Sequence, residues 1–227
     1  MAKELYIWGD PHLNHDNIRR FCGRPFPTVK EMNEALISNY NEVVNPKDDV
    51  IIVGDFAWSD HNHFLAQLHG RKTLIIGNHD KMPEAVLRNF TQVIGTPTKP
   101  GILETCIAGQ KISFSHYPLY SWNASFHGSW NIHGHCHGRL TEFDDLLRTD
   151  AGVDLYNFYP VNFEVLKLKL QSRVPAWKKK MEEVHPEGDE TSLSKNKTES
   201  LKFKQMFEEQ KAKNTNLLKV DYTYRKA

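Results

Sequence analysis

Three histidines, His133, His135 and His137, occupy every second position near the middle of the chain. Polar motifs with similar chemistry precede them: Asp10-Pro-His12, Gly54-Asp55, Gly77-Asn78-His79-Asp80 and His116. Together these motifs offer carboxylate, amide and imidazole ligands without needing a thiolate. Such a ligand set suits Mn, Fe, Co, Ni or Zn rather than a structural zinc–cysteine site. The sequence therefore predicts a metal centre.

Short apolar runs precede the first three motifs. Residues 5–8, 50–53 and 73–76 are rich in branched or aromatic side chains, and a glycine ends each run. They are typical of buried strands with helices on the faces of the sheet. We expect helices over residues 29–43 and 63–69, and another that starts near Pro83. Because ligands bind beyond the carboxyl ends of the strands in an open α/β sheet, the motifs should meet at one edge.

The second half of the sequence predicts further strands and few helices. Strands are expected over 102–108, 111–115, 130–135, 150–155 and 161–170, in a more antiparallel sheet. The predicted fold of residues 1–170 is therefore α/β, with two packed mixed β-sheets flanked by helices. Residues 171–227 are charged and poor in apolar side chains, which indicates a C-terminal extension that is partly helical or flexible.

The composition limits the classes of protein to consider. The net charge is +1, so charge alone does not point to nucleic acid. The three cysteines are scattered and imply no disulfide framework. The N-terminus lacks the apolar run of a signal peptide, and no stretch is long and apolar enough to span a membrane. We expect a cytoplasmic protein with no membrane partner.

The ordered motifs resemble the calcineurin-like metallophosphoesterase family, whose pattern is D-x-H, G-D, G-N-H-D/E, H and G-H-x-H. The resemblance covers residues 3–170 and is closest to small bacterial and phage phosphoesterases, which begin D-T-H-F-G-H-x-N-I and continue to R-P-F. Here the matching stretches are Asp10–Ile18 and Arg24-Pro25-Phe26. Pro11 and Asn14 depart from that pattern at positions that are not ligands. The family implies a four-layer α/β/β/α sandwich.

The resemblance also implies a dinuclear centre with two divalent cations. Mn²⁺ is the first choice, and Fe, Ni, Co or Zn are alternatives. Asp10, His12 and His137 would bind the first metal, Asn78, His116 and His135 the second, and Asp55 both. A hydroxide between the metals would attack phosphorus, His79 would assist the leaving group, and Asp80 would orient His79.

Other residues near the motifs are candidates for substrate binding. They are His15, Asn17, Arg24 and His127. Arg24 could bind a substrate phosphate with two parallel hydrogen bonds, or it could be a surface charge. His133 is interpreted as a packed histidine rather than a ligand. On an extended strand, Cys136 would point away from its histidine neighbours and would be a buried structural cysteine.

Several functions remain open at this level. The leading hypothesis is a metal-dependent phosphoesterase that acts on a phosphodiester or a nucleotide-type substrate. A phosphomonoesterase is one alternative, and a catalytically silent scaffold is another, although no ligand is missing. A zinc-finger module is excluded because the paired Cys and His spacing is absent. Basic and aromatic residues over 219–226 could contact nucleic acid or could be a solvated terminus.

Overall fold

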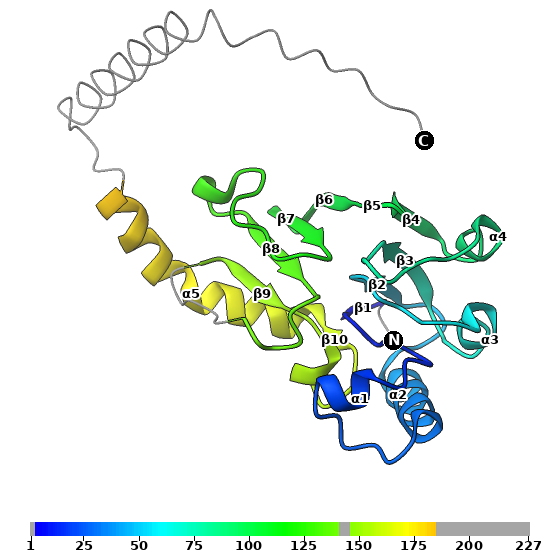
Figure 1. Cartoon of the computed structure of the whole chain (residues 1–227). Coiled ribbons are helices and arrows are strands. Elements are labelled where there is room, and N and C mark those ends of the chain that lie inside the picture. The colour runs from blue at the N-terminus through cyan, green and yellow to red at the C-terminus, as the bar shows by residue number, and fades with distance from the viewer. Residues whose placement is uncertain (1–2, 141–145, 185–227) are drawn as a thin grey trace, which may run out of the picture. The chain divides into compact units, whose positions relative to one another are not determined.

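The computed structural model describes residues 3–140 and 146–184 (Figure 1). Its first sheet has the strand order β10-β1-β2-β3-β4-β5. The strands are β1 (Leu5–Trp8), β2 (Asp49–Ile52), β3 (Arg71–Ile75), β4 (Gln92–Thr96), β5 (Lys99–Pro100) and β10 (Val161–Asn162). Strands β1 to β4 are parallel, and β5 and β10 add antiparallel edges. The three strands predicted to carry ligand motifs, β1, β2 and β3, are therefore neighbours.

Four helices connect these strands. They are α1 (Ile18–Phe21), α2 (Val29–Val43), α3 (His61–Leu65) and α4 (Glu84–Leu87). Helix α2 has the predicted bounds, because Thr28 and Glu31 form a capping box at its N-terminus. Its buried face includes Leu36 and Tyr40, which are spaced four residues apart. The predicted helix over 63–69 is instead the shorter α3, which begins two residues earlier.

The second sheet has the order β6-β7-β8-β9. Its strands are β6 (Ile102–Ile107), β7 (Gln110–Ser115), β8 (Trp130–His133) and β9 (Arg148–Asp150), with short 3-10 helices η1 (Ser125–His127) and η2 (Val153–Leu155). Strands β6 and β7 are antiparallel, whereas β7 pairs with β8 and β8 with β9 in parallel. The expectation of a more antiparallel second sheet is therefore wrong, and both sheets are mixed.

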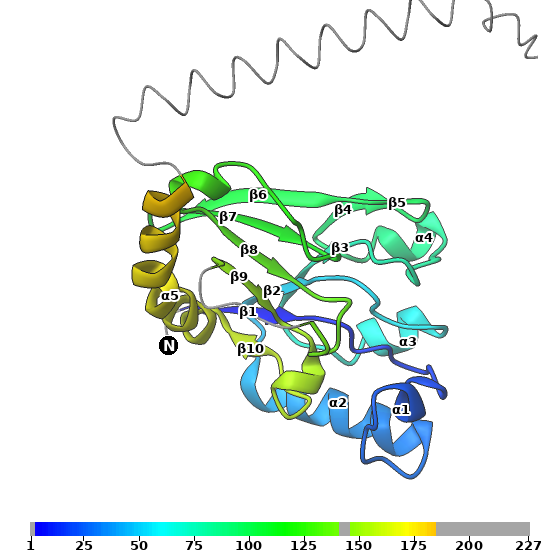
Figure 2. The same ribbon diagram turned by 60° about the vertical axis from the view of Figure 1, so that its left-hand side comes forward.

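Two apolar clusters hold these layers together. One joins the first sheet to α2, α3 and α4 through residues such as Trp8, Leu36 and Leu74. The other joins the opposite face of the first sheet to the second sheet, with Ile7 and Ile51 in the same cluster as Phe114 and Ile132. The strand residues alternate between the two clusters, as the period of two requires. Figure 2 shows the two sheets and their helices from the side. This confirms the predicted α/β fold of two mixed sheets flanked by helices.

The segment predicted as a strand over 161–170 is mostly helix. Only Val161 and Asn162 form β10, and α5 then runs over Phe163–Val184. The apolar residues alternate in sequence, but Val165 and Leu168 are 51% and 67% exposed. Leu166 and Leu170 are buried and four residues apart, which is the helical spacing. The alternating pattern therefore wrongly predicted a strand.

The predicted boundary between residues 170 and 171 lies inside α5. The first compact unit extends through Lys180, so the boundary stays a prediction. The features expected over residues 185–227 lie outside the described residues. Within residues 3–140 and 146–184, no helix is both long and apolar enough to cross a membrane.

Candidate metal centre

Loops that follow five strands bring the predicted metal ligands together. The strand before each ligand is β1 for Asp10 and His12, β2 for Asp55, β3 for Asn78, β7 for His116, and β8 for His135 and His137. Within residues 3–140 and 146–184, two of the groups able to hold a metal ion are Asp10–His12–His137 and Asp55–His116–His135. In each group, one ligand atom per residue lies within 4.8 Å of the others. The family resemblance assigns Asp10, His12 and His137 to one metal, and His116 and His135 to the other together with Asn78.

Asp55 belongs to the second group and also contacts the first. Its Oδ2 atom is 3.4 Å from Nε2 of His12 and 3.5 Å from Nε2 of His116. One carboxylate oxygen therefore contacts an imidazole from each group. A carboxylate oxygen in this position can be shared by two cations.

The surroundings of His116 favour a cation. Its Nδ1 atom is 2.9 Å from the carbonyl oxygen of Val53 and so carries the hydrogen. The lone pair on Nε2 then faces Oδ1 of Asn78 at 2.8 Å and Oδ2 of Asp55 at 3.5 Å. Burial lowers the pKa of His116, which favours the neutral ring. With the ring neutral, three electron-rich atoms converge there, and a bound cation would remove the repulsion between them.

The group around Asp10 also favours a bound cation. Nε2 of His12 and Oδ1 of Asp10 are buried and lack hydrogen-bond partners. Burial holds the pKa of His12 well below the usual value of an imidazole, and it holds the pKa of Asp10 well above the usual value of a carboxyl group. A cation would pair with both atoms and offset the cost of burying them unsatisfied. The residues present therefore fit a metal ion.

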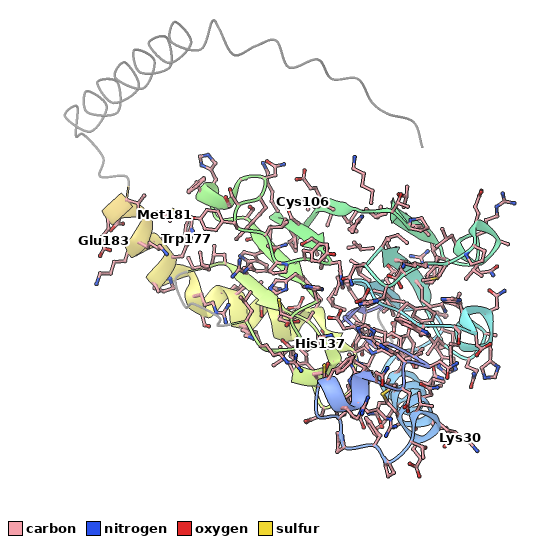
Figure 3. All side chains as sticks on the ribbon, viewed as in Figure 1. Lys30, Cys106, His137, Trp177, Met181 and Glu183 are labelled. Atoms are coloured by element: carbon pink, nitrogen blue, oxygen red, sulfur yellow. The ribbon has the colours of Figure 1, made fainter. Side chains whose placement is uncertain are left out.

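His137 completes this group through a carboxylate partner. Its Nδ1 atom donates to Oδ2 of Asp154 at 2.7 Å, which turns Nε2 toward the centre. Burial lowers the pKa of His137, but the hydrogen bonds to Asp154 and Cys22 outweigh burial and raise the pKa to about 10. His137, labelled in Figure 3, also lies close to Cys22, which follows α1. Cys22, His137 and Asp154 form a further group with metal-binding spacing.

Five of the seven predicted ligands have a left-handed backbone. The φ angles are 53° for Asp10, 50° for His12, 53° for Asp55, 71° for His135 and 49° for His137. Positive φ is uncommon outside glycine, although Asp and His tolerate it better than most residues. Such strain concentrates at functional sites, where the surrounding structure holds it in place.

Asp80 acts on the backbone rather than on the His79 ring. Its carboxylate accepts hydrogen bonds at 2.8 Å from the amides of Asp55, Phe56 and Gly77. No described contact joins it to the ring of His79, so the predicted orienting role is corrected to positioning of Asp55. Burial and the nearby Asp55 charge raise the pKa of Asp80 to about 7, against the lowering effect of the amides.

His79 is exposed at the margin of the centre. Its backbone amide donates to Oδ1 of Asp55 at 2.8 Å. Its ring centroid is 5.6 Å from that of His12. The imidazole is therefore held beside the candidate ligands and remains open to a substrate.

Arg24 is buried, in contrast to the predicted role in substrate binding. Its guanidinium donates to both carboxylate oxygens of Asp154 at 2.8 and 2.9 Å, and to the carbonyl oxygens of Asp10 and Pro11 at 2.7 and 2.8 Å. The remaining N–H faces the sulfur of Met32 at 3.7 Å. All five donors have partners, so Arg24 fixes the Asp10–His12 loop and cannot also bind a phosphate.

The other residues predicted to contact substrate lie in different parts of the structure. His15 is half-buried, and its Nδ1 atom is 3.3 Å from Nδ1 of His12. Asn17 is exposed at the start of α1 and accepts a hydrogen bond from Arg20. His127 lies before the amino end of β8, whereas the metal ligands follow its carboxyl end. Next to it, Gly128 lies against Trp177 of α5, labelled in Figure 3. The prediction that His127 lines the site is therefore wrong.

The histidine-rich motif is not one extended strand. Strand β8 ends at His133, which is 1% exposed, so the interpretation of His133 as a packed histidine is confirmed. His135 and His137 follow β8 in a loop, and both have positive φ. The alternation of side chains along a strand therefore does not apply to them. Cys136 is half-buried in that loop, not fully buried as expected, and burial raises the pKa of its thiol to about 11.

Three residues beside the centre were missed from the sequence. Asp154 supports His137 and Arg24 from a position far along the chain. The ring of Trp58 stacks on His15, and the ring of Tyr117 lies 4.6 Å from that of His135. Tyr117 follows the ligand His116 directly, and Trp58 follows Asp55 by three residues. Their closeness in sequence to a predicted ligand was the signal that could have identified both residues.

Comparisons with known proteins identify relatives. No family model matches the chain. An uncharacterised protein of Methanocaldococcus jannaschii, MJ1445, is 33% identical over 174 residues, covering 72% of this chain and 89% of that protein. The chain belongs to the same family as MJ1445. This relationship extends over most of both proteins but brings no established activity with it.

Solved structures support the fold. The protein of unknown function AQ665 from Aquifex aeolicus gives a TM-score of 0.56 at 23% identity, covering 74% of this chain and all of that one. A novel archaeal phosphodiesterase gives 0.35 at 18% identity, with coverages of 66% and 83%. Zinc-bound Vps29 from Entamoeba histolytica gives 0.36 at 15% identity, with coverages of 65% and 73%. The last two scores are too low to support an argument about this chain.

Proposed function

We propose that this protein is a dinuclear metal-dependent phosphoesterase. One observation carries the proposal: Oδ2 of Asp55 contacts an imidazole of each candidate ligand group. A structural site for a single metal needs no such shared carboxylate. Two metal ions held together are a recurring device for displacement at phosphorus.

The ligands divide between two divalent cations, with Mn²⁺ as the first choice. Asp10, His12 and His137 would hold one, Asn78, His116 and His135 would hold the other, and Asp55 would serve both. When bound, the cations supply positive charge that attracts the ester, lowers the pKa of water and stabilises charge that develops on oxygen. The hard and borderline donor set suits Mn²⁺, and Fe, Co, Ni or Zn are alternatives.

The chain itself supplies the group that assists the leaving oxygen. His79 is exposed, and its backbone is anchored to Asp55, so its ring can approach an ester at the centre without coordinating a metal. In the protonated form it gives a proton to the departing oxygen as the bond to phosphorus breaks. Asp80 contributes indirectly, because it fixes the backbone of Asp55 and therefore the position of the shared carboxylate.

The substrate we favour is a phosphodiester or a nucleotide-type ester. Trp58 is 55% exposed beside His79 and Tyr117 is 39% exposed beside the ligand His135, so the margin of the centre is open to a substituent on phosphorus. A phosphomonoester would use the same ligands and the same His79, and the assay below includes one. A nucleotide or nucleic acid is accordingly the partner class that we propose.

The test is hydrolysis of bis-p-nitrophenyl phosphate by the full chain, with Mn²⁺ and then with chelator. We expect chelator-sensitive release of nitrophenolate, and slower release from p-nitrophenyl phosphate. Asp55→Ala should lose metal and activity together. Asp16→Ala is the control, because that carboxylate is 63% exposed and pairs with Arg19. Metal-loaded protein that hydrolyses neither ester would refute the proposal and favour a silent scaffold. Retention of two metals by Asp55→Ala would refute the shared ligand.

A further inference from the structure

Trp58 presents an aromatic surface to solvent beside the candidate metal centre. Its side chain is 55% exposed. The indole lies almost parallel to the ring of His15, with centroids 4.4 Å apart and planes inclined by 13°. The backbone amide of Trp58 donates to the carbonyl oxygen of Leu13 at 2.8 Å, which fixes its position in the chain. One face of the indole is therefore covered, while more than half of the side chain remains accessible.

A row of rings connects this indole to the centre. The centroid of His15 is 5.2 Å from that of His12, a candidate ligand. The centroid of Trp58 is 5.7 Å from that of His79, the group that would assist the leaving oxygen. Trp58 thus lies on the His79 side of the ligands, where the leaving part of an ester would project.

We propose that Trp58 is a stacking platform for a planar aromatic ring on the ester bound at the centre, a nucleobase being the biological example. The inference rests on the proposed phosphoesterase function and specifies its substrate class. A nucleobase is joined to its phosphate through one sugar, so the phosphate can occupy the centre while the base reaches Trp58. Aromatic side chains stack with every base, because every base has a π-face. The platform therefore selects nucleotides as a class and does not select one base.

The surroundings of Trp58 argue against a surface for docking another protein. Its ring neighbours are His15 and His79, and the next residues in the chain are Ser59 and Asp60, all of which are polar. Ser59 and Asp60 also bind each other and the side chain of Asn14. Protein-docking surfaces are larger contiguous apolar patches. A single aromatic ring within polar groups is better suited to a small planar ligand.

The experiment compares two ligands that share a phosphate and differ by a base. Isothermal titration calorimetry would measure the binding of AMP and of ribose 5-phosphate to the metal-loaded full chain. We expect the wild-type protein to bind AMP about tenfold more tightly than ribose 5-phosphate. Trp58→Leu should abolish this difference and leave ribose 5-phosphate unchanged, whereas Trp58→Phe should retain most of it. Phe126→Ala is the control, because Phe126 is 59% exposed on η1, before the amino end of β8.

Each outcome separates this inference from the function on which it rests. Equal affinities for the two ligands, absent AMP binding, or an unchanged AMP preference in Trp58→Leu would overturn the platform. A loss of AMP affinity in Phe126→Ala equal to that in Trp58→Leu would also overturn it. Binding of AMP through Trp58 by a protein that hydrolyses no ester would support the platform and refute the phosphoesterase. Hydrolysis of an ester by a protein that shows no preference for AMP would support the phosphoesterase and refute the platform.

Discussion

Replacing Arg24 with methionine tests whether this residue supports the metal centre or binds substrate. The Arg24 side chain is 0% exposed and that of its partner Asp154 is 10% exposed, so solvent screens the ion pair little. Removing one member of a buried pair costs about 3–5 kcal/mol when the other charge is left uncompensated, but Asp154 keeps its contact with His137. Two backbone carbonyls also lose their donor, so the expected loss is about 3–4 kcal/mol. We expect the free energy of unfolding in urea to fall by this amount with an unchanged m-value.

A double-mutant cycle with Asp154→Asn isolates the pair. The double variant should be clearly more stable than the sum of the single effects implies, because it also removes the carboxylate charge that Arg24→Met leaves without its guanidinium partner. Arg88→Met is the matched control: Arg88 is 74% exposed, and losing its ion pair with Glu84 should change stability by no more than about 0.5 kcal/mol. The reasoning would be refuted if Arg24→Met unfolded like the wild type while the KM for an ester rose.

Four further predictions concern the support of the ligands, the leaving group, protonation and the domain boundary. Asp80→Asn should weaken Mn²⁺ binding by about tenfold or more, measured by calorimetry, because three backbone amides lose a charged acceptor. His79→Ala should leave that affinity unchanged and slow hydrolysis most for poor leaving groups. Mn²⁺ binding near neutral pH should release about one proton from His137, whose pKa is about 10 before the metal binds. Below that pKa, the affinity for Mn²⁺ should therefore rise about tenfold for each unit by which the pH increases. Calorimetry in buffers of different ionisation enthalpy counts this proton. A chain ended after Leu170 should unfold at lower urea than one ended after Val184, because only the longer chain keeps Trp177 against the core.

Each of these predictions has a result that would contradict it. Rates of hydrolysis in His79→Ala equal to those of the wild type would remove His79 from the reaction. Unchanged Mn²⁺ affinity in Asp80→Asn, with slower turnover, would return Asp80 to the role of orienting His79. Binding without proton release would remove His137 from the ligand set or show that it is already neutral. Equal unfolding midpoints for the two truncated chains would support the predicted boundary between residues 170 and 171.

The sequence could predict the strands and the ligand motifs because both depend on local patterns. A buried parallel strand is an apolar run, and its carboxyl end is marked by glycine and a polar residue, as at Gly54-Asp55. The glycines themselves are explained only by the structure. A Cβ atom on Gly77 would lie 2.3 Å from Oδ1 of Asp55, so the backbone must approach the ligand there. The same local method failed at α5, where an alternating pattern coincided with a helical one.

The supporting residues could not be predicted because their partners are distant in sequence. Arg24 and Asp154 are 130 positions apart, and nothing near Arg24 indicates that its charge is buried. A motif that places arginine near metal ligands is equally compatible with a phosphate contact. Burial decides between the two roles, and burial is a property of the fold. Trp58 shows the converse, since an aromatic residue after a buried strand would ordinarily be assigned to the core.

The left-handed ligands explain why such distant residues matter for metal binding. A left-handed conformation costs an L-residue about 1–2 kcal/mol, so it persists only where neighbouring contacts determine it. Asp80 binds the amide of Asp55, Arg24 binds the carbonyl of Asp10, and Asp10 in turn accepts a hydrogen bond from the amide of His135 at 2.7 Å. Each contact fixes the backbone of a ligand that has positive φ. Substitution of Asp80 or Arg24 should therefore release this strain and move the ligand atoms, which is why metal affinity, rather than substrate affinity, should report the change.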